Sequence, residues 1–182
     1  RAGFGRQSMD MPMEDLEACL TSQLQDIATI AEEVGVSLTH LKPHGALYND
    51  AQDDPALSRL LVDVAARAGL TLVSMPGSLI QKKAAERQVR FLAEAFIDRR
   101  YTGLGRLVPR SQAGAVIADE EDRISQGLAL ATGAALTTQD GGSLAIGAQS
   151  LCLHSDSDGA LETAKKMRLA LEEAGIAISS AG

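Results

Sequence analysis

The chain has 182 residues, of which 45% are hydrophobic and 23% are charged. This composition predicts a globular protein, most simply a single domain with a buried core. The formal net charge of −7 argues against nucleic acid or an anionic membrane as the main partner, because both attract basic surfaces. The sequence shows neither a signal-peptide pattern nor an apolar run approaching the roughly 18 residues of a membrane span, so we expect a cytoplasmic protein.

The ends and the cysteines add two expectations. The chain begins at Arg1 without an initiator Met, which is typical of the middle of a longer protein, so we expect the fold to lack N-terminal elements. Cys19 lies in a helical pattern and Cys152 in an apolar run, which favours buried thiols in a reducing compartment over a disulfide.

Helices and strands alternate along the predicted chain. Hydrophobic spacings of three and four predict helices over 13–34, 55–68, 78–87, about 119–131, and from about 159 to 174, the last with Asp158 as its N-cap and Leu161 facing inward. Short apolar runs predict strands over 36–41, 70–75, 89–96, 149–153 and 176–178, and a hairpin over 135–146. Repeated strand–helix units predict a parallel sheet, which an open doubly wound sheet and a barrel satisfy equally.

Polar side chains follow three of these strands. Lys42, His44 and Tyr48 follow the first, Asp98 follows the strand over 89–96, and His154 with Asp156 follows the strand over 149–153. The carboxyl ends of parallel strands share one edge, so we expect these groups on a common rim. The third histidine, His40, lies within a strand and is interpreted as structural.

The segment 98–117 is the longest without clear periodicity, and loops of this length in compact domains are often functional. It carries a local excess of arginine in an acidic protein: Arg99, Arg100, Arg106 and Arg110. Guanidinium groups bind carboxylate or phosphate, which indicates an anionic ligand; the alternative is a solvated, purely structural cluster.

Two chemistries fit the rim. One is general acid–base hydrolysis, in which His44 or Asp156 activates water and Lys42 or an arginine stabilises the oxyanion. The other is a metal site using His44, His154 and a carboxylate, but no close His-x-x-x-His or His-x-His spacing supports it, so no metal ligand is assigned. A nucleophilic serine is weaker still, since no Gly-x-Ser-x-Gly motif is present.

Four segments together resemble a known family. They are Lys-Pro-His-Gly-Ala-Leu-Tyr-Asn at 42–49, Glu-Ala-Phe-Ile-Asp-Arg-Arg-Tyr at 94–101, Leu-Val-Pro-Arg-Ser-Gln-Ala-Gly-Ala-Val-Ile at 107–117 and Cys-Leu-His-Ser-Asp at 152–156, with Gly-Phe-Gly-Arg at 3–6 agreeing. In this order they are similar to the LamB/YcsF family, whose members include the A subunits of 5-oxoprolinases.

The resemblance implies an α/β fold, a (β/α) barrel of about seven strands related to polysaccharide-deacetylase barrels. Here it would be one domain over 1–182 that lacks the family's N-terminal strands. The implied activity is the ATP-dependent hydrolytic opening of 5-oxoproline to L-glutamate, with ATP consumed by a complex that includes 5-oxoprolinase subunits B and C. A metal requirement and association into homo-oligomers are left open.

Within that activity, the candidate residues fall into two sets. The catalytic set is Lys42, His44, Asp98, His154 and Asp156, and the substrate-binding set is Arg6, Tyr48, Asn49, Arg99 and Arg110. Two alternatives remain: a non-catalytic subunit that binds a carboxylate or serves assembly, and a stand-alone metal-dependent amide hydrolase. The sequence also departs from the family at Ser155, where Gly is usual, and at 157–158, where Thr-Pro is common.

Overall fold

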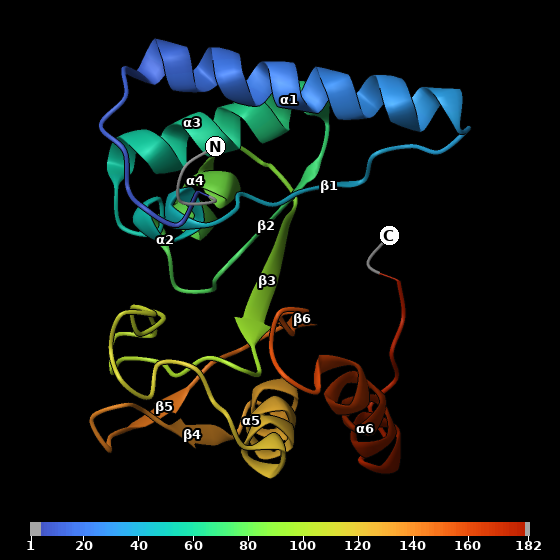
Figure 1. Ribbon diagram of the computed structural model, residues 1–182. Helices are drawn as coiled ribbons and strands as arrows, with labels where there is room; N and C mark the ends of the chain where they lie inside the picture. The colour runs from blue at the N-terminus through green and yellow to red at the C-terminus, as the bar shows by residue number, and fades with distance from the viewer. Residues whose placement is uncertain (1–4, 181–182) are drawn as a thin grey trace. The chain divides into compact units, whose positions relative to one another are not determined.

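The computed structural model describes residues 5–180, so Gly3 and Phe4 of the first matched motif lie outside the described residues. The chain divides into two compact units, Arg1–Leu92 and Ala93–Gly182. The first contains α1 (Met13–Glu33), β1 (His40–Leu41), α2 (Ala46–Asp50), α3 (Pro55–Ala68), β2 (Thr71–Ser74) and α4 (Leu79–Glu86). The boundary falls inside β3 (Phe91–Phe96), and the second unit continues with α5 (Glu120–Thr132), β4 (Ala135–Thr137), β5 (Ser143–Ala145), β6 (Ser150–Cys152) and α6 (Ala160–Glu173) (Figure 1).

The helices of the first unit begin and end at residues suited to caps. The Asp54 side chain accepts hydrogen bonds from the backbone N–H groups of Ala56 and Leu57, and Gly69 ends α3 in the left-handed conformation. Ser78 caps α4 by accepting a hydrogen bond from the Gln81 N–H, as its place before the helical pattern predicts. These local signals explain why the predicted helices over 55–68 and 78–87 are confirmed.

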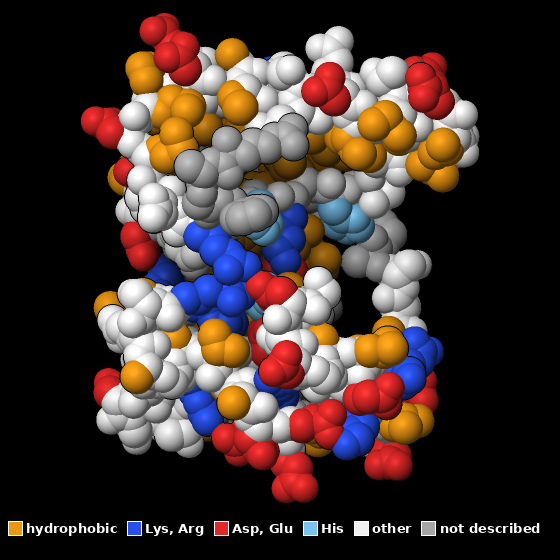
Figure 2. Space-filling view, in the orientation of Figure 1, with side chains coloured by type: hydrophobic (Ala, Val, Ile, Leu, Met, Phe, Trp, Pro, Cys, Tyr) orange, Lys and Arg blue, Asp and Glu red, His pale blue; other side chains and the backbone are white. Residues whose placement is uncertain are grey.

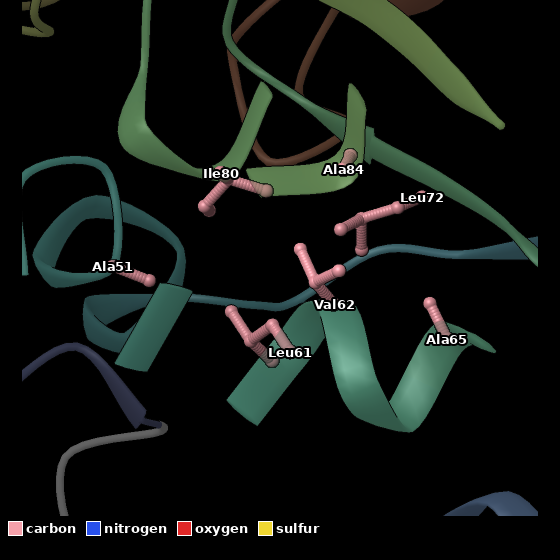
Figure 3. Close-up of a cluster of buried hydrophobic side chains, with 7 residues drawn as sticks. All are labelled: Ala51, Leu61, Val62, Ala65, Leu72, Ile80 and Ala84. Carbon is pink, nitrogen blue, oxygen red and sulfur yellow. The ribbon is translucent and has the colours of Figure 1, made fainter. Parts of the chain in front are cut away.

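The core of the first unit forms between α3, β2 and α4. Its buried members are small and aliphatic, and Figure 3 shows them converging from α3, β2, α4 and the residue that follows α2: Ala51, Leu61, Val62, Ala65, Leu72, Ile80 and Ala84. β1 pairs with β2 in parallel, with His40 opposite Thr71 and Leu41 opposite Leu72. The parallel pairing predicted from strand–helix alternation is therefore present.

Helix α1 is only partly covered by the rest of its unit. Ala31 is buried, but Ile27, Ile30 and Val34 are 47%, 53% and 66% exposed. Figure 2 shows hydrophobic side chains gathered along this helix. Cys19 is also exposed, so the prediction of a buried thiol is wrong for this residue, because Ala31 is the one residue of α1 that the fold buries.

In the second unit β3 pairs with β6 in parallel, with Phe96 opposite Cys152. The predicted hairpin is confirmed by the antiparallel pairing of β4 with β5. Helix α5 packs against α6 at Gly127, where an added Cβ would collide with the Met167 sulfur. The Cys152 side chain is half-buried.

Several predicted boundaries are wrong. The strand over 36–41 is reduced to His40–Leu41, and the short helix α2 lies where a loop was expected. Residues 176–178 form no strand, and α6 is capped by Gly159 in the left-handed conformation instead of by Asp158. Leu161 is 67% exposed instead of facing inward. Periodicity identifies an apolar face but does not show whether a neighbour covers or pairs with it.

None of the helices within residues 5–180 combines the length and the apolar character needed to cross a membrane.

Candidate active site

A buried carboxylate and an imidazole meet in the second unit. The Asp98 side chain is fully buried, and the Nδ1 atom of His154 lies 3.0 Å from its Oδ1 and 2.9 Å from its Oδ2. The backbone N–H of His154 donates to the same Oδ2 at 3.2 Å. The His154 side chain keeps 27% of its surface exposed. The pair thus joins a carboxylate that is shielded from solvent to an imidazole ring that solvent can reach.

The pairing of β3 with β6 explains why these two residues meet. Phe96 and Cys152 are opposite each other in the parallel ladder, and the Ile97 N–H donates to the Cys152 carbonyl at 3.0 Å. Asp98 and His154 each follow two residues later, at the carboxyl ends of the two strands. The expectation that Asp98 and His154 share a rim is confirmed within this unit.

Two neighbours complete the pair. The Phe96 ring stacks on the His154 ring with centroids 5.4 Å apart and an interplanar angle of 17°. The Ser157 hydroxyl donates to Asp98 Oδ2 at 3.2 Å. The carboxylate therefore accepts from His154 and Ser157, and the imidazole is held between a carboxylate and an aromatic face.

The electrostatics favour an ionised Asp98. Burial alone raises the pKa of this carboxyl, but the hydrogen bond from the His154 ring, the charge of that ring, its backbone N–H and the Ser157 hydroxyl together lower the pKa below its ordinary value. An ionised carboxylate only accepts hydrogen bonds, so the facing Nδ1 must carry a proton. When the ring is neutral, its basic lone pair is therefore on Nε2, the arrangement of a general base oriented by a carboxylate.

The turn that carries Asp98 is supported by Gln126 of α5. The Gln126 Nε2 group donates to the carbonyl oxygens of Phe96, Ile97 and Arg99, at 2.9, 3.3 and 2.8 Å. The Tyr101 hydroxyl accepts from the Phe96 N–H at 2.7 Å. These hydrogen bonds satisfy backbone groups where β3 ends and hold Asp98 in place.

In the first unit, the residues around Gly45 form a second polar cluster. Lys42 and His44 are exposed, whereas Tyr48 is buried in α2, and the Lys42 Nζ lies 5.8 Å from the centroid of the Tyr48 ring. The exposed Asn49 donates through Nδ2 to the Gly45 carbonyl at 3.1 Å. The structure therefore brings Lys42 and Tyr48 together and turns Asn49 back on its own loop.

Gly45 has a backbone that only glycine adopts readily, with φ 65° and ψ −131°. An added Cβ would collide with the Gly5 carbonyl. The N-terminal segment with Gly5 and the exposed Arg6 therefore lies directly against the His44 loop.

The arginines of the long loop differ in their surroundings. Arg99 is 5% exposed and its guanidinium donates to the backbone carbonyls of Ala115 and Val108, at 3.3 and 2.5 Å. Burial, together with the nearby charge of Arg110, lowers the pKa of Arg99. Arg110 is exposed, so of these two residues it is the one open to a ligand.

Roles on substrate stay predictions for all of these residues. Arg99 holds its own loop together through backbone carbonyls, a role that the sequence did not predict. Asp156 is exposed and lies two residues after His154. Sequence reasoning missed Phe96, Gln126 and Ser157. The alternation of β3 could have indicated Phe96, because Phe96 and Asp98 are two residues apart; neither of the other two gave a comparable signal.

Among residues 5–180 no group of three or more His, Cys, Asp or Glu side chains is arranged to hold a metal ion. The His154–Asp98 contact is a two-residue arrangement of the kind used to orient an imidazole.

The fold and the site define an α/β protein with parallel strands, whose buried Asp98 orients an accessible histidine at the strands' carboxyl ends. The chain belongs to the LamB/YcsF family, whose model matches residues 1–182.

Known relatives agree over nearly the whole chain. The 5-oxoprolinase A subunit of Streptomyces coelicolor is 40% identical over 181 residues, which cover 98% of this chain and 72% of the relative. The protein of the same name from Histophilus somni is 38% identical over 182 residues, covering 99% and 74%. The crystal structure of a lactam utilization protein from Thermus thermophilus has a TM-score of 0.85 at 35% identity, covering 97% of this chain and 71% of that one.

Proposed function

We propose that the chain acts as the A subunit of a 5-oxoprolinase, which opens the lactam ring of 5-oxoproline with water to give L-glutamate. The names of the relatives and the lactam utilization protein support this substrate class. The single observation that carries a hydrolytic role is the His154–Asp98 contact at 2.9 Å, because ring opening needs a base that removes a proton from water. The proposal includes a (β/α) barrel of about seven strands as the complete fold.

In this mechanism His154 Nε2 takes a proton from the attacking water, and the water oxygen forms a bond to the lactam carbonyl carbon. The C–N bond of the ring breaks, and the departing nitrogen takes up the proton that the His154 imidazolium holds. Buried Asp98 stabilises the imidazolium that forms and holds the ring in the required tautomer.

The remaining predicted residues supply charge and proton transfer. Lys42 is proposed to stabilise the negative oxygen, His44 and Asp156 to move protons, and exposed Arg110 to bind the substrate carboxylate. Tyr48, Asn49, Arg6 and Arg99 stay in the proposed substrate-binding set, Arg99 through the loop that it holds together. ATP is a proposed co-substrate: through subunits B and C its terminal phosphoryl group would be transferred to the amide oxygen, leaving ADP, and phosphate would leave after water attacks.

The test is reconstitution with purified B and C subunits, measuring glutamate formation and 5-oxoproline-dependent ATP hydrolysis. Replacing the base by His154→Gln should lower kcat/KM by about 100-fold or more. The matched control is His40→Gln, because His40 is half-buried in β1 beside Thr39 and outside the proposed machinery.

The outcomes separate the alternatives. Undiminished glutamate formation by His154→Gln would contradict the catalytic role and favour a non-catalytic role in binding or assembly. Lactam opening by the chain alone, without ATP and abolished by a chelator, would instead favour a metal-dependent amide hydrolase. His44→Ala with full activity would remove His44 from the mechanism.

A further inference from the structure

A third residue acts on the Asp98–His154 pair. The Ser157 hydroxyl donates to Asp98 Oδ2 at 3.2 Å, and the Ser157 backbone N–H returns to the His154 carbonyl at 3.4 Å. The chain between His154 and Ser157 is therefore a closed turn whose two ends bind the same buried carboxylate. Ser157 belongs to no residue set that the sequence predicted.

The contact with the His154 ring alone does not fix the orientation of the Asp98 carboxylate. His154 Nδ1 lies 3.0 Å from one Asp98 oxygen and 2.9 Å from the other, so its N–H favours neither oxygen. The terminal torsion of an aspartate is broad, so a carboxylate held by no other donor can rotate, which tilts and lengthens its contact with the Nδ1 N–H. Other donors must fix the plane of the carboxylate.

Both additional donors bind Oδ2. One is the His154 backbone N–H at 3.2 Å and the other is the Ser157 hydroxyl at the same distance. Removing Ser157 leaves one donor to distinguish the two oxygens. Since an oriented carboxylate is what fixes the tautomer and plane of its partner imidazole, freedom in Asp98 becomes freedom in His154.

We infer that Ser157 is a positioning residue, which locks the Asp98 carboxylate and through it the Nδ1-protonated tautomer and the plane of the His154 ring. The inference rests on the proposed function for its kinetic consequence, because only there is His154 the base. Its structural content concerns the ring itself and is measured without substrate.

The experiment compares Ser157→Ala, Ser157→Thr and Ser155→Ala with the wild-type chain. Thr keeps the hydroxyl, and Ser155 is an exposed serine of the same turn. With only three histidines in the chain, the His154 ring nitrogens can be assigned in ¹⁵N NMR spectra as the signals lost in His154→Gln.

In Ser157→Ala the two ring nitrogen shifts should move toward each other, as the Nδ1-protonated and Nε2-protonated forms mix. In the reconstituted complex kcat should fall roughly fivefold, the equivalent of one ordinary hydrogen bond, with KM nearly unchanged. Ser157→Thr should restore both quantities, and Ser155→Ala should match the wild type in both.

Wild-type nitrogen shifts in Ser157→Ala would overturn the inference, as would failure of Thr to restore them or equal changes in Ser155→Ala. If the wild-type complex opens no lactam but the shifts respond to Ser157→Ala and recover in Ser157→Thr, the proposed function fails and the positioning role of Ser157 is supported.

Discussion

The Nδ1 atom of His154 lies 2.9 Å from Oδ2 of Asp98, although the two residues are 56 positions apart in the sequence. Parallel pairing of β3 with β6 produces this contact, since each residue follows its strand by the same interval. The hydrogen bond is therefore set by the register of the sheet, and a shift of register would remove it.

Asp98 should link stability to pH. Its pKa is lowered in the folded chain, so the ionised group stabilises the fold above its ordinary pKa of 3.8, and this stabilisation is lost as the pH falls through the lowered folded value. We expect Asp98→Asn to be less stable than the wild type at pH 7 and the difference to shrink as the pH falls below 3.8. Urea unfolding of both proteins at a series of pH values from about 7 down to about 3 measures the difference.

The control for that measurement is Glu162→Gln. Glu162 is exposed and its pKa is lowered by a hydrogen bond from Lys165 on the surface, where solvent screens the interaction. Its removal should leave the acid dependence close to that of the wild type. If the free energy of unfolding depended on pH equally in the wild type and in Asp98→Asn, the predicted link between Asp98 ionisation and stability would be contradicted.

Gly45→Ala should destabilise the first unit and displace His44. The added Cβ both occupies a backbone region unfavourable to other residues and collides with the Gly5 carbonyl, so we expect a loss of about 2 kcal/mol or more. Gly35→Ala is the matched control, because Gly35 also has a positive φ but has open space around it. Its cost should be about 1 kcal/mol, and equal losses would show that the Gly5 contact has no effect.

Arg99→Lys should lower stability, whereas Arg110→Lys should affect substrate binding. Lysine cannot reproduce the two bonds from the Arg99 guanidinium to the carbonyls of Val108 and Ala115, so thermal stability should fall, by about 1–3 kcal/mol. Exposed Arg110→Lys should leave stability within about 0.5 kcal/mol and raise KM for 5-oxoproline. An unchanged KM would exclude Arg110 from carboxylate binding.

Gln126→Leu should loosen the turn after β3. The substitution leaves the carbonyls of Phe96, Ile97 and Arg99 without their shared side-chain donor, at an expected cost of about 1–3 kcal/mol. Gln25→Leu on exposed α1 is the control for adding an apolar side chain. Denaturant midpoints give both values, and similar small changes in the two variants would show that the donor is dispensable.

The sequence predicts those elements whose signals are local. Asp54 and Gly69 mark the ends of α3, and the alternation of strands and helices predicts the parallel pairing that brings Asp98 and His154 to one edge. The family assignment, made from four motifs, is confirmed over residues 1–182.

What the sequence does not predict depends on neighbours distant along the chain. The run 36–41 has strand propensity along its length, yet only His40 and Leu41 form the strand beside β2. Arg99 lies in a loop whose composition is that of a surface, but the fold buries it. Gln126 contacts the turn after β3 and Ser157 contacts Asp98 only because the fold brings α5 and the 154–157 turn beside that strand. The spacing of residues in the sequence does not predict this placement.

The close approach of Gly5 to Gly45 has a consequence for how the loop with His44 acquires its shape. Along the sequence the two glycines are separated by the whole of α1, so this contact cannot form until the chain has folded back along the helix. Such non-local contacts form slowly compared with a helical turn. The conformation of residues 42–49 should therefore be among the later features of the first unit to mature, and a fragment starting at α1 would lack it.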